Sequence, residues 1–213
     1  DPTASAPSIS LYVMNYKKLD VQMYSVQPSD WQVFLTYLDE YRWTDRPQDP
    51  PGKLLLDETR SVDTTTDVLS EVNLDLSEFM DGDFGHFVVI VKPHKGLFEE
   101  ENYWDTVHVW AQITQIGLDA FSDHSELVVW ATALSDGAPL AGVKIEDGFA
   151  HTTAVTGEDG ITRFEQPVGG TQYLLAQLDD DVAMLPYNTY YSKDENGWTP
   201  RSVSDSMRWF VYD

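Results

Sequence analysis

Short apolar runs separated by turn-forming residues fill the second half of the chain, and this pattern limits the possible folds more than any other feature. The runs occupy residues 127–133, 143–145, 154–156, 173–177 and 182–185. Between them lie the turn-favouring pairs Asp136-Gly137, Asp159-Gly160 and Gly169-Gly170. Several short strands divided by such turns are typical of an antiparallel β-sandwich. We therefore expect one sandwich domain here.

Alternating apolar and polar residues predict strands in the first half as well. Leu11 and Val13 flank Tyr12, and residues 19–23 alternate in the same way. This alternation predicts two half-buried strands, which we expect to pair through a turn at residues 15–18. Further strands are expected at 54–56, 72–76 and 85–91, the last of them central in its sheet because it is continuously apolar.

One helix is predicted inside the first half, near residues 29–45. Ser29 can cap it, and Gln32, three residues later, can complete a capping box. Large apolar side chains follow at helical spacing, at Trp31, Phe34, Leu35 and Leu38. The helix should end near Arg46-Pro47, because proline disfavours helical geometry in the residue before it.

The length predicts two domains, because a sandwich of this type needs roughly 100 residues and the chain has 213. We place the boundary in the Pro-, Gly- and Glu-containing stretch 93–105, so that one domain spans 1–105 and the next 106–213. The second domain is expected to begin with a strand at 107–113 and to close with one at 207–212. Residues 1–7 and 211–213 resemble the cut ends of a piece of a longer protein.

Charge and composition limit the partners. The net charge is −23, with 8 basic and 20 acidic residues up to Asp105 and 5 and 16 after it, so acidity is spread over the chain. Such a field repels nucleic acid phosphates and anionic lipids, and we expect no nucleic acid partner. The acidity suits a solvated surface at high salt or low pH, or one that binds cations.

No apolar run approaches the roughly 18 residues that span a bilayer, so we expect no membrane insertion by these residues.

Cysteine is absent, which excludes disulfides and thiol catalysis within these residues without identifying the compartment. The densest carboxylate cluster is Asp179-Asp180-Asp181. Oxygen ligands suit calcium, yet consecutive strand residues point to opposite faces, so we favour a solvated turn and keep these three as weak metal candidates. No cofactor is expected.

No catalytic motif can be assigned. The five histidines, at positions 86, 94, 108, 124 and 151, form no zinc-binding spacing, and no Gly-x-Ser-x-Gly occurs. A pair of glycosidase-type carboxylates cannot be selected by spacing among 36 acidic residues. We therefore predict a protein that is not an enzyme and assign no catalytic residue.

The aromatic residues divide into two sets. Trp130 and Trp209 lie in apolar strand runs and Trp31 on the helix's apolar face, so all three are candidate core residues. The second set lies in the polar stretch 187–206, at Tyr187, Tyr190, Tyr191 and Trp198. Those rings either contact a partner or a sugar, or pack on a sheet or a neighbouring domain.

Four segments resemble the macroglobulin-like domains of bacterial alpha-2-macroglobulins. They are VWATALSDGAPLAGVKI at 129–145, AVTGEDGITRF at 154–164, LLAQLDDDVAMLP at 174–186 and, less specifically, EVNLDLSEFMDGDFGHFVVIVKP at 71–93. The resemblance implies a mainly β chain of two macroglobulin-type sandwich domains, of the fibronectin III or immunoglobulin-like kind. A similar acidic turn joins the same two strands in related domains.

In that family a shell of such domains traps a peptidase after it cuts a bait segment, and some members tether it through a Cys-Gly-Glu-Gln thioester. These 213 residues lack that cysteine and show no bait segment. The resemblance therefore implies non-catalytic scaffold domains of a broad-spectrum endopeptidase inhibitor in the periplasm, cell envelope or outside the cell. Their partners would be neighbouring domains and, through the whole protein, peptidases. The alternatives are a cell-surface adhesion or carbohydrate-binding module and, third, an acidic enzyme.

Overall fold

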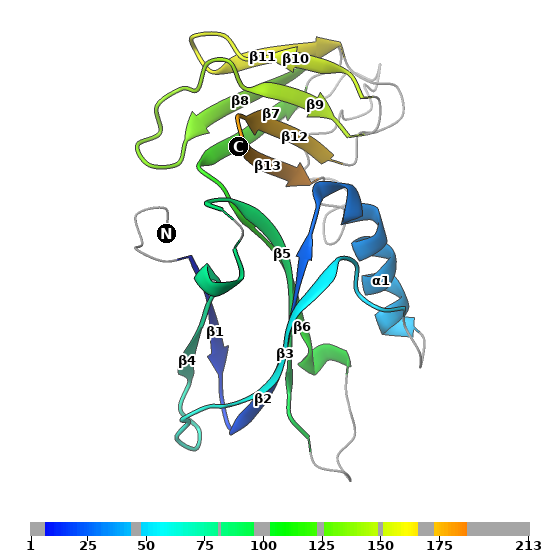
Figure 1. Cartoon of the computed structure of the whole chain (residues 1–213), viewed down its shortest axis with the longest axis vertical. Helices are drawn as coiled ribbons and strands as arrows, with labels where there is room; N and C mark the ends of the chain where they lie inside the picture. The colour runs from blue at the N-terminus through cyan, green and yellow to red at the C-terminus, as the bar shows by residue number, and fades with distance from the viewer. Residues whose placement is uncertain are drawn as a thin grey trace, which may run out of the picture. The chain divides into compact units, whose positions relative to one another are not determined.

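The computed structural model describes residues 7–43, 48–80, 82–95, 103–122, 126–148, 151–165 and 173–186. The chain is mainly β, with antiparallel sheets and one α-helix in these residues, which confirms the predicted fold class (Figure 1). It divides into two compact units, Asp1–Thr114 and Gln115–Asp213. Each unit has a hydrophobic core of its own, as two separate sandwiches require.

The described residues of the first unit form a two-stranded and a four-stranded sheet. Strands β1 (Ser8–Val13) and β4 (Ser70–Asp75) form the smaller sheet. The larger has the order β3-β2-β5-β6, with β2 (Lys18–Val26), β3 (Lys53–Ser61), β5 (Gly85–Pro93) and β6 (Val107–Ile113). Short 3-10 turns lie at η1 (Pro28–Asp30), η2 (Ser77–Phe79) and η3 (Tyr103–Asp105).

The core of this unit lies between the two sheets, because every second side chain of each strand points to the face that the sheets share. Val21 and Met23 of β2 meet Leu74 of β4 there, and Val89 of β5 joins them. Strand β5 is buried on both faces, which confirms the predicted central strand and explains its continuous apolar run.

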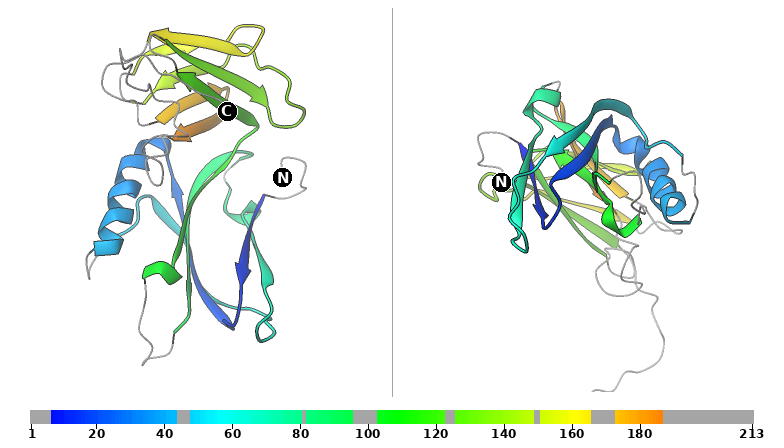
Figure 2. Two further views of the ribbon diagram at one scale, coloured as in Figure 1. Left: turned by 180° about the vertical axis from the view of Figure 1, so that it is seen from behind. Right: turned by 90° about the horizontal axis from the view of Figure 1, so that it is seen from below.

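Helix α1 (Trp31–Trp43) covers the other face of the four-stranded sheet (Figure 2). Phe34 and Tyr37 are buried against Val26, Val88 and Ile90. Residues 44–47, where we expected the helix to end, lie outside the described residues.

The predicted Ser29 capping box is wrong by two residues. The turn η1 precedes the α-helix, and Gln27 takes the capping position. The backbone nitrogen of Gln27 donates to Asp30 Oδ2 at 2.8 Å, and the backbone nitrogen of Asp30 donates to the backbone carbonyl oxygen of Gln27, also at 2.8 Å. Pro28 at the first helical position has no backbone N–H, so it leaves no unpaired donor there, which favours the earlier start.

Two strand assignments in the first unit differ from prediction. Strand β1 pairs with β4 instead of β2, because the residues between β1 and β2 carry the chain from one sheet to the other. Strand β6, expected to open the second domain, instead pairs with β5 from Gly85↔Ile113 to Val91↔Val107. The first unit consequently extends to Thr114.

Within its described residues, the second unit is a sandwich of a three-stranded and a four-stranded sheet. The first has the order β11-β8-β7, with β7 (Ile116–Ser122), β8 (Glu126–Ala133) and β11 (Ile161–Glu165). The second has the order β10-β9-β12-β13, with β9 (Lys144–Asp147), β10 (Thr153–Val155), β12 (Tyr173–Leu178) and β13 (Asp181–Pro186). Its core residues come from both sheets: Val129, Ala131, Val143, Ile145, Leu174 and Ala176 are fully buried.

The turn at Asp159-Gly160 is confirmed, and it requires glycine. Gly160 has φ +73°, and a Cβ atom there would lie 2.5 Å from the Ala131 carbonyl oxygen. Gly169-Gly170 and the predicted strand 207–212 lie outside the described residues. Among the helices of the described part, none is long and apolar enough to cross a membrane.

Candidate functional site

The acidic turn does not present its three carboxylates together. Asp179 and Asp180 are exposed in the β12–β13 turn, where Asp179 adopts a left-handed φ of 52°. Asp181 is only 5% exposed, and its Oδ2 accepts a hydrogen bond of 2.8 Å from the backbone nitrogen of Gln115. Asp181 therefore ties the start of β13 to the residue that precedes β7.

Among the described residues, no group of three or more His, Cys, Asp or Glu side chains lies close enough together to hold a metal ion. Asp181 Oδ1 is buried with no hydrogen-bond partner in that part of the chain. The three weak metal candidates are thus divided between one buried and two solvated positions.

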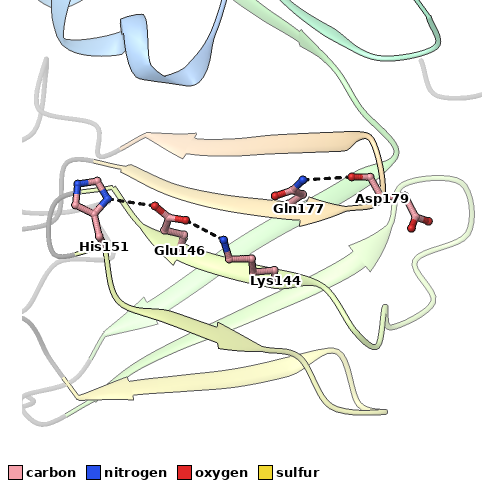
Figure 3. A network of polar contacts seen from close by, with 5 residues as sticks. All are labelled: Lys144, Glu146, His151, Gln177 and Asp179. Atoms are coloured by element: carbon pink, nitrogen blue, oxygen red, sulfur yellow. Dashed lines mark hydrogen bonds and ion pairs between the residues drawn. The ribbon is translucent and has the colours of Figure 1, made fainter.

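A polar network lies on the outer face of β9 and β12 (Figure 3). Glu146 Oε2 accepts from Lys144 Nζ at 3.2 Å, and Glu146 Oε1 lies 3.2 Å from His151 Nδ1. The hydrogen bond with His151 lowers the pKa of the Glu146 carboxyl, partial burial opposes that effect, and Lys144 adds to it. Gln177 Nε2 donates to the Asp179 carbonyl oxygen at 3.3 Å beside them. His151 is largely exposed, so this arrangement is a solvated surface network.

A second cluster of ionisable groups lies beneath helix α1. Tyr37 Oη and His108 Nε2 are 3.0 Å apart, and Tyr41 Oη lies 2.9 Å from Thr106 Oγ1. Burial, helped by the positive charge of Arg42, lowers the pKa of His108 to about 4. Burial also raises the pKa of Tyr37. Both groups are therefore neutral at pH 7, and their hydrogen bond joins the helix to β6.

A small hollow lies on the four-stranded sheet of the first unit. Its lining residues are Asp20, Gln22, Asp57, Ile90 and Lys92. Its volume of about 190 Å³ is below the roughly 300 Å³ at which typical ligand pockets begin. Asp20 Oδ1 is already bonded to Thr59 Oγ1 at 2.6 Å and His94 Nδ1 at 2.8 Å. Burial raises the pKa of Asp20, and these two hydrogen bonds outweigh it, so the pKa is lowered. Two other lining groups are bonded to each other, because Gln22 Nε2 donates to Asp57 Oδ2 at 3.2 Å.

One further histidine of the described residues, His86, is also held in place. His86 is buried, and its Nδ1 accepts from Trp110 Nε1 at 3.2 Å. His124 lies outside the described residues. The hydrogen bonds of His94, His108 and His151 join them to a carboxylate, a tyrosine and a carboxylate, and not to the hydroxyl of a serine or threonine nucleophile.

Trp31 is partly buried and packs against the core beneath helix α1, which confirms its predicted inward face, while the prediction for Trp130 is wrong. Trp31 packs against Phe34 and, edge to face at 5.3 Å, against Trp110. Trp130 is 42% exposed, because Leu127, Val129 and Ala131 take the inward positions of β8. Strict alternation within this run was the signal that could have placed Trp130 outside.

The remaining aromatic predictions stay untested. Trp209, Tyr187, Tyr190, Tyr191 and Trp198 lie outside the described residues.

The comparisons with known proteins identify the fold. No protein-family model matches the sequence, and no curated protein matches it. Among solved structures, Escherichia coli alpha-2-macroglobulin spanning domains NIE-MG1 is similar with a TM-score of 0.62 and 18% identity, over 83% of this chain and 86% of that chain. A structure of the same protein spanning domains MG0-NIE-MG1 has a TM-score of 0.61 and 17% identity, over 86% of this chain and 59% of that one.

A mutant of Salmonella alpha-2-macroglobulin is similar over 85% of this chain and 11% of that chain, with a TM-score of 0.51 and 15% identity. These matches confirm, at the level of the fold, the resemblance that the sequence segments indicated. The chain has the fold of domains of bacterial alpha-2-macroglobulins.

Proposed function

We propose that this chain is a pair of non-catalytic structural domains within a longer, alpha-2-macroglobulin-like endopeptidase inhibitor. The observation that carries the proposal is the match to the NIE-MG1 pair, which covers most of both chains and so includes both units in one sequence order. A shared sandwich alone would be weak support, because one fold serves many functions. A match that covers both units of this chain in one sequence order is more specific.

The ionisable groups of the described residues support a structural role. His108 and Tyr37 are held neutral beneath the helix, and the carboxylates of Asp20 and Glu146 are bonded to neighbouring side chains. Catalytic groups are instead expected to converge on a pocket with pKa values near the working pH. This chain would contribute geometry and transmit the rearrangement that follows cleavage elsewhere in the protein. It would do so in the periplasm, the cell envelope or the extracellular space.

The test is a trapping assay on the natural protein that contains these residues. The protein is mixed with a trypsin-like peptidase, and cleavage of a large protein substrate is compared with cleavage of a small chromogenic peptide. A trapped peptidase loses activity on the large substrate and keeps it on the small one. Full activity on both substrates at a twofold excess of the inhibitor would contradict the proposal.

The 213-residue chain alone is the matched control. We expect it to leave both activities unchanged, because two domains cannot enclose a peptidase. Stoichiometric inhibition by these residues alone would show that they bind the peptidase directly, and the scaffold role would be wrong.

A further inference from the structure

The layer beneath helix α1 differs from the rest of the first unit in containing histidine. The core between the two sheets is built from apolar side chains such as Val21, Met23 and Val89, and its described members include no titratable group. On the other face of the four-stranded sheet, His86 of β5 and His108 of β6 lie among the residues that pack with α1. Histidine is the side chain whose ordinary pKa lies between pH 5 and 8. Mild acid can therefore charge the layer under the helix and leave the core between the sheets unchanged.

His108 lies under the C-terminal half of α1. Its ring contacts those of Tyr37 and Tyr41 at 5.4 and 4.5 Å, and its Nε2 is 3.0 Å from Tyr37 Oη. Arg42 of the same helix acts on His108 with a positive charge, which opposes protonation as burial does. The residue opposite His108 on β5 is Ile90, which is apolar. None of these neighbours is a carboxylate that could pair with a charged His108.

His86 is kept neutral by a hydrogen bond. The residue is buried, and its Nδ1 accepts from Trp110 Nε1 at 3.2 Å. Imidazole with a proton on both nitrogens is a donor only, so the added proton on Nδ1 would face the indole N–H. The residues opposite His86 on the neighbouring strands are Val26 and Gln112, and neither is charged. Trp110 packs edge to face at 5.3 Å against Trp31, so protonation of His86 disturbs the ring on which the start of the helix rests.

Helix α1 depends on this layer for its stability. It has 13 residues, and isolated helices of about that length are marginal in water. Trp31 Nε1 is buried without a hydrogen-bond partner among the described residues, and an unpaired buried donor weakens the packing. Proteins open in local units whose stability varies across the structure. A charge placed under α1 should therefore release the helix before the strands separate.

We propose that α1 is an acid-released element, in which protonation of His86 and His108 detaches the helix while the two sheets of the first unit stay folded. Release uncovers Val88, Ile90 and Trp110 on the outer face of the four-stranded sheet. The unit then presents an apolar face in acid that is covered at neutral pH, which is how histidine-based pH sensors alter a surface. The inference concerns this unit alone and is independent of the proposed inhibitor role.

Hydrogen exchange of the 213-residue chain at pH 7.5 and pH 5, read by mass spectrometry, tests the release. Each rate is divided by the intrinsic amide rate at that pH, so that protection factors are compared. Opening of the helix returns the pKa of His108 from about 4 to 6.5, so protection of α1 should fall at least about tenfold between the two pH values. Strand β2 of the same unit is the internal reference, and its protection should change by less than about threefold.

Neutral substitutions show whether the histidines are the cause. His86→Asn keeps an acceptor near the position of Nδ1, and His108→Gln keeps a polar group near Tyr37 Oη. The double variant should lose most of the pH effect on α1, and His108→Gln alone should lose part of it. His94→Asn is the matched control and should lose none, because His94 bonds to Asp20 and its side chain is 44% exposed.

Three results would overturn the inference. The first is equal protection of α1 at both pH values in the wild type, and the second is a parallel loss in α1 and β2, which would mean that the whole unit unfolds. The third is an undiminished loss in the double variant. If the double variant is unprotected already at pH 7.5, His108→Gln decides by the same comparison.

Dye binding follows the uncovered face directly. Fluorescence of ANS, which binds exposed apolar surface, should rise between pH 7.5 and pH 5 in step with the loss of α1 protection, and should reverse on return to pH 7.5. The signal of the His94→Asn control should follow that of the wild type. A rise of the same size in the double variant would show that the apolar surface comes from elsewhere in the chain and would overturn the inference.

Discussion

At the scale of single residues, Asp181 is one of two buried acidic residues in the part of the chain that the structure describes. Its Oδ2 accepts from Gln115 N, and the residue is almost fully buried. Asp181→Ala leaves the Gln115 nitrogen without this acceptor, which costs about 1 to 3 kcal/mol. Urea unfolding of the 213-residue chain measures the loss. Asp180→Ala, at the exposed neighbouring position, should change the unfolding free energy by less than about 0.5 kcal/mol.

Equal effects of the two substitutions would contradict the reading of Asp181 as a buried tie between β13 and the residue before β7. The sequence alone could not separate these neighbours. The sequence shows three consecutive aspartates but not where the turn ends and the strand begins. Asp181 is buried because it is the first residue of β13, whereas Asp179 and Asp180 lie in the exposed turn.

His108 makes stability depend on pH. Its pKa is about 4 in the folded protein and 6.5 in its unperturbed state, so between these values the unfolded chain binds a proton that the folded one does not. The stability that the neutral His108 ring contributes is therefore fully present above pH 6.5, and it decreases as the pH falls toward 4. The total loss is a few kcal/mol at most, because the ring is only partly buried.

The measurement compares the wild type with His108→Gln by urea unfolding at pH 7 and pH 5. Gln is neutral at both values and retains a polar group near Tyr37 Oη. We expect the wild type to lose more unfolding free energy than the variant between the two pH values. Parallel losses would show that His108 is not desolvated in the folded state.

At the scale of elements, helix α1 is held to its sheet by an aromatic layer. Phe34 is 3% exposed and packs with Val26, Val88 and Ile90. Phe34→Ala should cost about 3 to 5 kcal/mol, because it removes a buried ring and leaves a cavity. Val33→Ala, at a position 48% exposed on the same helix, is the control and should cost less than about 1 kcal/mol.

Urea unfolding followed by circular dichroism gives both values, and hydrogen exchange of the helix amides locates the effect. If Phe34→Ala and Val33→Ala were equally mild, the helix would not be docked through this face.

Elements could be predicted from local pattern, but their partners could not. Alternation placed strands at 11–13, 19–23 and 107–113 correctly. It carries no information about the neighbouring strand, which is set by contacts far apart in sequence. Strand β1 therefore pairs with β4, some sixty residues away, and β6 with β5. Local pattern also misplaced Trp130. Almost every residue in 127–133 is apolar, so inward and outward positions look alike in the sequence, and Trp130 was assigned to the core.

At the scale of the whole molecule, the two compact units have separate cores, and their limits can be tested by truncation. Strand β6 pairs with β5 along its length, and Thr106 and His108 hold Tyr41 and Tyr37 of the helix. A fragment of residues 1–114 should therefore unfold cooperatively. A fragment of residues 1–105 should be strongly destabilised or aggregate, because it exposes the edge of β5, the most buried strand of the sheet. Fragment 115–213 is the control for the second unit. Thermal unfolding by circular dichroism and size-exclusion chromatography distinguish the cases, and a 1–105 fragment as stable as 1–114 would place the boundary back in residues 93–105.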